Sequence, residues 1–269
     1  MRWTIVALLI LGVCLMLGCD SNDPSTVAED PPVAEPVTSG PPSEDYSLVW
    51  SDEFTGTLLD LTKWRHRLQG PRFCAINTKE AVTLDGKGHL VITAKRVGDE
   101  IWTGMIGTQD TFLATHGYFE CRVLMQPARG CRSAFWLTSP LMGNTDNNPA
   151  VNGAELGIYT CSRPDADWVN QYVHWNGWGA DSHQVSFGPC SVSSVAGEYH
   201  TYGLEWTDGG YVYYIDGQVS GRTSQGLSRT DQYIVLNVDV SEEDAPIAMS
   251  SHLFRDSVTF DYVRVYQKT

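Results

Sequence analysis

From Tyr46 to the C-terminus, hydrophobic and polar residues alternate in short runs, and almost no stretch has the spacing of an amphipathic helix. Gly, Asp and Asn residues separate the runs, as turn residues separate strands. A hairpin is predicted where Asp208-Gly209-Gly210 joins two of these runs. We expect strands at residues 89–96, 117–125, 133–139, 201–207, 211–220, 232–240 and 257–267. Such a series predicts one all-β domain, a two-sheet antiparallel β-sandwich or jelly roll.

The N-terminus reads as a sorting signal. A positive start at Met1-Arg2 is followed by an apolar run that is too short for a comfortable transmembrane span. The run ends in Met16-Leu17-Gly18-Cys19, which resembles a bacterial lipobox. We therefore predict a lipoprotein signal peptide at 1–18 and an acyl-anchored mature protein that begins at Cys19. An ordinary secretory signal is the alternative.

Residues 19–45 are rich in Pro, Ser, Asp and Glu and predict a disordered linker. The folded domain is then 46–269. This arrangement places the protein in the bacterial cell envelope, lipid-anchored to a membrane and facing the periplasm or the exterior.

The composition narrows the set of partners. The net charge of −14 argues against nucleic acid, and nine Trp and twelve Tyr supply aromatic surface for a core and for carbohydrate stacking. We expect a monomer. Five cysteines lie beyond the predicted signal peptide and Cys19, and their odd number leaves one free or paired with another molecule. In an oxidising compartment, some of the five should form disulfides. The five are Cys74, Cys121, Cys131, Cys161 and Cys190.

Six segments together carry a resemblance to a known family. They are LVWSDEFTGTLLDLTKW, HLVITAKR, GYFECRV, AFWL, HTYGLEWTDGGYVYYIDGQ and FDYVRVYQ. In this order they resemble glycoside hydrolase family 16, from about Leu48 to Gln267. The resemblance implies a concanavalin A-like jelly roll with a sugar-chain cleft on its concave face. It also implies a retaining O-glycosyl hydrolase of β-linked polysaccharides, β-glucan or galactan, that requires no cofactor.

The family's catalytic strand has the pattern Glu-x-Asp-x-x-Glu, and this chain keeps one of the three acids. Glu155 falls on the nucleophile position, Gly157 on the helper Asp position and Thr160 on the acid/base position. A retaining glycosidase uses two carboxyl groups about 5–5.5 Å apart. The five-residue spacing needs a β-bulge to bring both ends to one face. In the shorter family pattern, Tyr159 would take the acid position instead.

The retained acid and the substituted positions each leave two interpretations. Glu155 is a working nucleophile or an acid that only binds sugar hydroxyls. Gly157 widens the cleft or reflects drift after loss of catalysis. A replacement acid could come from His174 or from the loop with Asp165 and Asp167.

The resemblance also suggests substrate-binding residues. Arg132 stands where the family often has a Trp, and a guanidinium there could bind a carboxylate or sulfate; the alternative is a solvated loop arginine. The full set of candidates is Arg132, Trp136, Tyr159, His174, Trp175 and Trp178.

Members of this family often carry a structural calcium. The resemblance would place its ligands at Glu53, Gly88 and Asp261, with structural hydrogen bonds as the alternative.

Two functional hypotheses follow. The first is an endo-acting glycosidase with Glu155 as nucleophile, and the second is a lipid-tethered, non-catalytic polysaccharide-binding protein. A second carboxyl group within reach of Glu155 would favour the first. An envelope lipoprotein without a glycan ligand is a third hypothesis.

Overall fold

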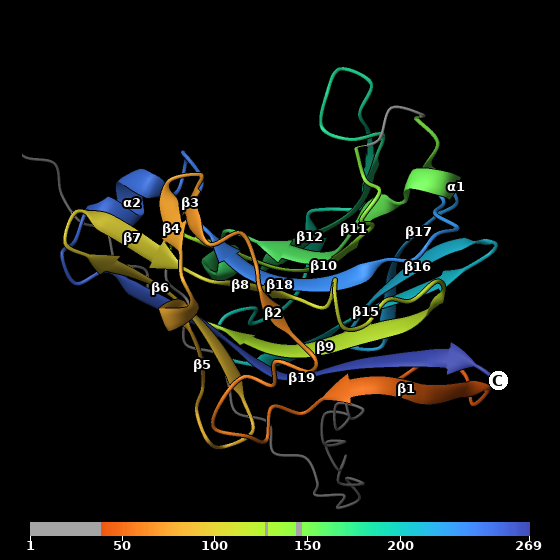
Figure 1. Cartoon of the computed structure of the whole chain (residues 1–269), viewed down its shortest axis with the longest axis horizontal. Coiled ribbons are helices and arrows are strands. Elements are labelled where there is room, and N and C mark those ends of the chain that lie inside the picture. Colours follow the sequence, from red (N-terminus) through yellow and green to blue (C-terminus); the bar gives the residue numbers. More distant parts are fainter. Residues whose placement is uncertain (1–38, 127–128, 144–146) are drawn as a thin grey trace, which may run out of the picture. The chain divides into compact units, whose positions relative to one another are not determined.

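The computed structural model describes residues 39–126, 129–143 and 147–269, so the predicted signal peptide and Cys19 lie outside the described residues. Two sheets form the two layers of the folded unit (Figure 1). The larger sheet has the strand order β17-β16-β15-β9-β19-β6-β7-β4-β3, with β1 beside β19 and β5 beside β6. Its strands are β1 (Tyr46–Asp52), β3 (Gly70–Arg72), β4 (Ala75–Asn77), β5 (Val82–Leu84), β6 (Leu90–Val97), β7 (Glu100–Thr103), β9 (Gly117–Met125), β15 (Tyr199–Thr207), β16 (Gly210–Ile215), β17 (Gln218–Thr223) and β19 (Arg255–Lys268).

The second sheet has the order β13-β12-β11-β10-β18-β8-β2, with β14 beside β12. Its strands are β2 (Arg65–His66), β8 (Met105–Gly107), β10 (Arg132–Thr138), β11 (Ala154–Cys161), β12 (Trp168–Trp175), β13 (His183–Ser186), β14 (Cys190–Ser191) and β18 (Tyr233–Asp239). The helices of the described residues are short: η1 (Lys79–Ala81), α1 (Pro149–Asn152), η2 (Pro164–Ala166) and α2 (Ala245–Met249). The two-sheet antiparallel jelly roll is therefore confirmed.

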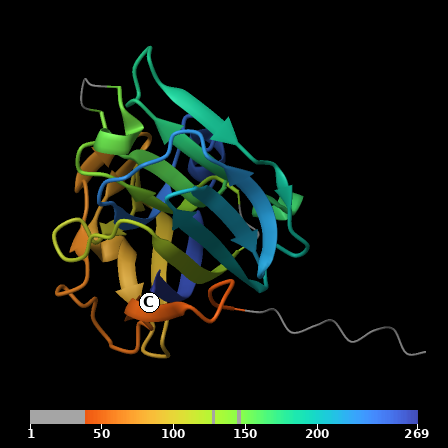
Figure 2. The ribbon, with the colours of Figure 1, turned by 90° about the vertical axis from the view of Figure 1, so that its right-hand side faces the viewer.

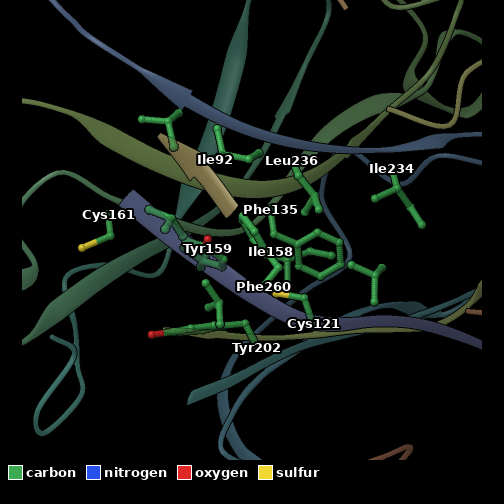
Figure 3. Packing of buried hydrophobic residues seen from close by; sticks show 14 of the residues in the cluster. Ile92, Cys121, Phe135, Ile158, Tyr159, Cys161, Tyr202, Ile234, Leu236 and Phe260 are labelled. Atoms are coloured by element: carbon green, nitrogen blue, oxygen red, sulfur yellow. The ribbon is translucent and has the colours of Figure 1, made fainter. Parts of the chain in front are cut away.

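The hydrophobic core lies between the two sheets. Phe135, Ile158 and Leu236 of the smaller sheet meet Phe260 of the larger one, and all four side chains are fully buried (Figure 3). Burying a side chain of this size contributes about 1.5–3 kcal/mol. The alternation that predicted the strands is thus the alternation between this core and the outer faces.

The first and last strands of the folded domain are neighbours in the larger sheet. Strand β1 pairs antiparallel with β19, and Tyr46 lies opposite Lys268. Figure 2 shows the C-terminus beside β1 for this reason.

The predicted hairpin at Asp208–Gly210 is confirmed as β15–β16. The single strand predicted at 211–220 is wrong, because a second turn divides it into β16 and β17. Asp216 and Gly217 have φ values of 50° and 74°. Two successive positive φ values are the mark of the two-residue hairpin turn, so the Asp-Gly pair was the missed signal.

The expectation of disulfides is wrong for the described residues, in which all five cysteines are free. Three of them are buried, and thiols donate to oxygen atoms instead of pairing with each other. The Sγ atom of Cys131 lies 3.1 Å from Oδ2 of Asp256, and that of Cys190 lies 3.0 Å from the carbonyl oxygen of Phe187. Burial raises the pKa of the Cys121 and Cys131 thiols well above the ordinary range, so both remain protonated.

Candidate functional site

A cleft of about 480 Å³ lies on the outer face of the smaller sheet. Its lining residues come mostly from strands β10, β11, β12, β13 and β18 and from the β3–β4 hairpin of the other sheet. Figure 1 shows where these strands and the hairpin lie. The lining residues are Arg72, Phe73, Arg132, Ala134, Trp136, Glu155, Thr160, Asn170, Tyr172, His174, Trp178, Gln184, Ser186, Asn237 and Asp239.

A β-bulge in β11 determines which side chains of this strand point into the cleft and which point into the core. Trp136 pairs with Gly157, but the next residue of β10, Phe135, pairs with Tyr159, so Ile158 is the extra residue. Beyond the bulge, Thr160 lines the same cleft as Glu155. The five-residue spacing therefore operates as the longer family pattern requires, although its last position holds a hydroxyl and not a carboxyl.

The same bulge turns Tyr159 inward, which corrects its expected place among the substrate-binding residues. Its ring is fully buried, and its centroid lies 4.6 Å from that of Tyr202 on the opposite sheet (Figure 3). It has no access to a ligand in the cleft.

Tyr172 occupies the space of the missing helper carboxylate. It lies opposite Gly157 on β12, and a Cβ atom on Gly157 would lie only 2.3 Å from Cε1 of the Tyr172 ring. The glycine therefore does not widen the cleft, because the ring of Tyr172 fills the room that its missing side chain leaves. Gly157 and Tyr172 are a matched pair.

Tyr172 also holds Glu155. Its hydroxyl donates a hydrogen bond to Oε1 of Glu155, with 2.7 Å between the oxygens. Burial, and next the negative charge of Glu155, raise the pKa of Tyr172 well above the ordinary value, so the phenol stays protonated and remains a donor. One carboxylate oxygen is thus engaged by the protein, as it would be by a helper acid.

Glu155 has no carboxylate partner at catalytic distance among the described residues of the lining. Among the described residues that line the cleft, the one other carboxylate is that of Asp239. By register, Glu155 lies level with Thr138, whereas Asp239 lies opposite Arg132. The two residues thus lie six β10 positions apart along the sheet, and the Asp239 carboxylate is occupied by Arg72, which donates to both of its oxygens.

The acids of the loop after β11 do not replace the missing carboxyl group. Asp165 accepts hydrogen bonds from Arg129 and Arg163, and Asp167 accepts one from the backbone of Val195. Neither lines the cleft. His174 does line it and lies directly opposite Glu155 on β12.

The cleft brings together four of the expected binding residues, namely Arg132, Trp136, His174 and Trp178. Nε1 of Trp136 donates to Oδ1 of Asn237 at 2.6 Å, which fixes its ring. Trp178 is 64% exposed, and its ring lies edge-on to that of His174. An exposed indole over a polar cleft is well placed to stack on a sugar ring.

Trp175 is the second correction. Because successive side chains of a strand point to opposite faces, Trp175 points away from the cleft that His174 lines. It packs on the core, and its ring stacks on His183 with 5.5 Å between centroids.

Several lining residues were not predicted from the sequence. Asn170 and Tyr172 could have been found, because they alternate with His174 on one face of β12. Arg72 and Phe73 gave no signal, since their hairpin reaches the cleft from the other sheet.

The two carboxylates expected to bind calcium form ion pairs with arginines. Both oxygens of Glu53 accept from Arg264 at 2.9 Å, and Oδ2 of Asp261 accepts from Arg122 at 2.6 Å. Gly88 lies beside the backbone carbonyl of Glu53. Both carboxylates thus make the structural hydrogen bonds that were the alternative, and the described residues contain no cluster of three or more His, Cys, Asp or Glu side chains suited to a metal. The calcium site stays a prediction.

Membrane attachment through Cys19 concerns residues outside those described. In the part of the chain that the structure describes, no helix has the length and apolar character needed to cross a membrane.

A family profile and several known proteins match this chain. The profile described as "Glycosyl hydrolases family 16" matches residues 70–245. The chain is 28% identical over 176 residues to the endo-1,3-1,4-beta-glycanase EglC of Rhizobium meliloti, a match that covers 65% of this chain and 35% of that protein. It thus spans about a third of that relative's length. It is 23% identical over 290 residues to a beta-glucanase of Rhodothermus marinus, covering 99% of this chain and 95% of that protein.

Among solved structures, the laminarinase from Rhodothermus marinus superposes with a TM-score of 0.70. The two sequences are 22% identical, and the match covers 83% of this chain and 98% of that one. A likeness at this identity shows a shared fold.

Proposed function

The chain belongs to glycosyl hydrolase family 16, and from this premise we propose that its cleft binds a β-linked polysaccharide, β-glucan or galactan, without hydrolysing it by the family's two-carboxylate mechanism. The glucanase names of its relatives support the ligand class. The proposal extends to the whole protein as a surface receptor for such a polymer.

One observation carries the proposal: the lining keeps the means to bind sugar but pairs Glu155 with Tyr172 and not with a second acid. Exposed aromatic planes and amide side chains suit the two faces and the hydroxyls of a sugar ring. Loss of general acid help costs a glycosidase about 10²–10⁴-fold in rate. Binding is therefore the activity that this arrangement supports best.

Replacing Trp178 by alanine should weaken polysaccharide binding by about tenfold, the effect of losing one exposed aromatic anchor. The measurement is affinity gel electrophoresis of the soluble domain with laminarin and mixed-linkage glucan in the gel. Trp102→Ala is the matched control, because Trp102 lies on β7 outside the cleft. Equal retardation of wild type and Trp178→Ala would contradict a binding role for this cleft.

A slow hydrolase is the second candidate, and the position of His174 favours it. Glu155 would attack the anomeric carbon as the glycosidic C–O bond breaks, and His174, which lies opposite it on β12, would protonate the leaving oxygen. Water would then release the sugar from Glu155. Turnover that depends on both residues would distinguish this candidate from a binding protein.

We also propose that the protein is held at the bacterial envelope by acylation of Cys19. The lipobox-like Met16–Cys19 segment supports this. Membrane fractionation of a Cys19→Ala variant tests it, since release into the soluble fraction is the expected result.

A further inference from the structure

One end of the cleft is built around two arginines and an exposed aromatic ring. We call this group, Arg72, Phe73, Arg132 and Asp239, the arginine subsite; all four residues line the cleft. It lies at the opposite end of β10 from the level of Glu155.

The β3–β4 hairpin delivers Arg72 and Phe73 to the cleft. Its two-residue turn is Phe73-Cys74, and the Cys74 N–H donates to the carbonyl of Val240, the residue after β18, at 3.1 Å. Phe73 has a φ of 49°, a conformation that is rare for a bulky residue. The ring is nevertheless 63% exposed, so burial does not account for its presence. A costly conformation that presents an aromatic ring at a cleft suits contact with a ligand.

The charges of the subsite do not cancel. Asp239 is nearly buried, and it accepts from Nε of Arg72 at 3.1 Å and from its terminal nitrogen at 3.4 Å. A nitrogen of Arg132 lies 3.8 Å from the same carboxylate. Two guanidinium groups share one carboxylate, which leaves one positive charge in a chain whose net charge is −14. Asp239 thus orients both arginines while Arg132 keeps donors for a ligand.

Both guanidinium groups also border the aromatic ring. The guanidinium carbon of Arg72 lies 4.5 Å from the Phe73 ring centroid, and that of Arg132 lies 6.0 Å from it. An acidic substituent on a sugar that contacts Phe73 would therefore lie next to the guanidinium groups of Arg72 and Arg132.

We propose that the arginine subsite recognises an anionic substituent, a carboxylate or a sulfate ester, on the bound polysaccharide. Arginine donors match the paired oxygens of either group, and the aromatic ring would take the sugar face. The proposal rests on the polysaccharide-binding function above and specifies its substrate class as an acidic β-linked polymer.

The test compares two pairs of polymers by affinity gel electrophoresis. One pair is κ-carrageenan and its chemically desulfated form, and the other is carboxymethylated and unmodified β-1,3-glucan. The wild type should bind the anionic member of at least one pair more tightly, and the responding pair identifies sulfate or carboxylate as the ligand group. The difference in affinity between the anionic and the neutral polymer should decrease as the salt concentration is raised, because exposed charges are screened.

Arg132→Gln should lose about tenfold in affinity for the preferred anionic polymer and change less than about twofold on its neutral partner, as expected for loss of a charge-assisted pair. Phe73→Ala should weaken both members of the pair, which separates stacking from charge. Arg222→Gln is the matched control, since this exposed arginine of β17 lies outside the cleft. Thermal melting of each variant verifies that it is folded.

Equal binding of anionic and neutral polymers by the wild type would overturn the proposal and leave the polysaccharide-binding function intact. An equal loss in Arg132→Gln and Arg222→Gln would overturn it as well, because net charge and not the subsite would then set the affinity. Failure to bind any of the four polymers would overturn the proposed function itself.

Discussion

Replacing Thr160 by glutamate should raise hydrolysis of β-glucan by about 10²–10⁴-fold over the wild type, the contribution of a general acid. The bulge in β11 already brings residue 160 to the face of the cleft that Glu155 lines. A carboxyl group there would supply the missing partner of Glu155. The measurement is the initial rate of reducing-end release from laminarin and mixed-linkage glucan.

Thr160→Gln is the control for this variant, because it has the size of glutamate without the acid. Adding Glu155→Gln to Thr160→Glu should abolish the gain, since a retaining mechanism needs both carboxyl groups. A Thr160→Glu protein no faster than Thr160→Gln would refute the mapping of Glu155 and Thr160 onto the family's nucleophile and acid positions.

Gly157→Asp, which restores the helper acid, should destabilise the domain by about 1–3 kcal/mol, as overpacking does. The reason is that the new Cβ would lie 2.3 Å from the Tyr172 ring. For a domain of this size the loss corresponds to a fall in Tm of roughly 2–12 °C. The measurement is thermal unfolding followed by circular dichroism.

Gly179→Asp provides a matched glycine, because a Cβ there meets no atom within 4 Å. Adding Tyr172→Ala to Gly157→Asp should recover part of the lost stability, since it removes the ring that collides. If the Tm of Gly157→Asp equals that of Gly179→Asp, the ring of Tyr172 moves aside freely. Gly157 and Tyr172 are then not a matched pair.

The fold could be predicted because its information is local. Alternation along each strand and the turn residues between strands identified β9, β15 and β18 and the hairpin at Asp208–Gly210. The split of 211–220 into two strands was missed because Tyr211–Ile215 and Gln218–Ser220 look like one alternating run across the Asp216-Gly217 turn.

The site could be predicted only as far as the family pattern and strand periodicity reach. They placed Glu155, Gly157 and Thr160 on one face, and the structure brings them there. The contact between Tyr172 and Gly157 joins residues on neighbouring strands, and no local pattern announces it. Phe73 is still harder to find, because its hairpin belongs to the other sheet and is tied to this one by the backbone hydrogen bond from Cys74 to Val240.

We propose that Glu155 serves binding and not turnover in the natural chain. The most direct test of this role is a reducing-end assay of the soluble domain and of Glu155→Gln on laminarin, mixed-linkage glucan, agar and carrageenan, with polymer binding measured on the same samples. We expect binding by the wild type, with no release of reducing ends beyond that of Glu155→Gln. Turnover by the wild type that disappears in Glu155→Gln would contradict it and establish Glu155 as a working nucleophile.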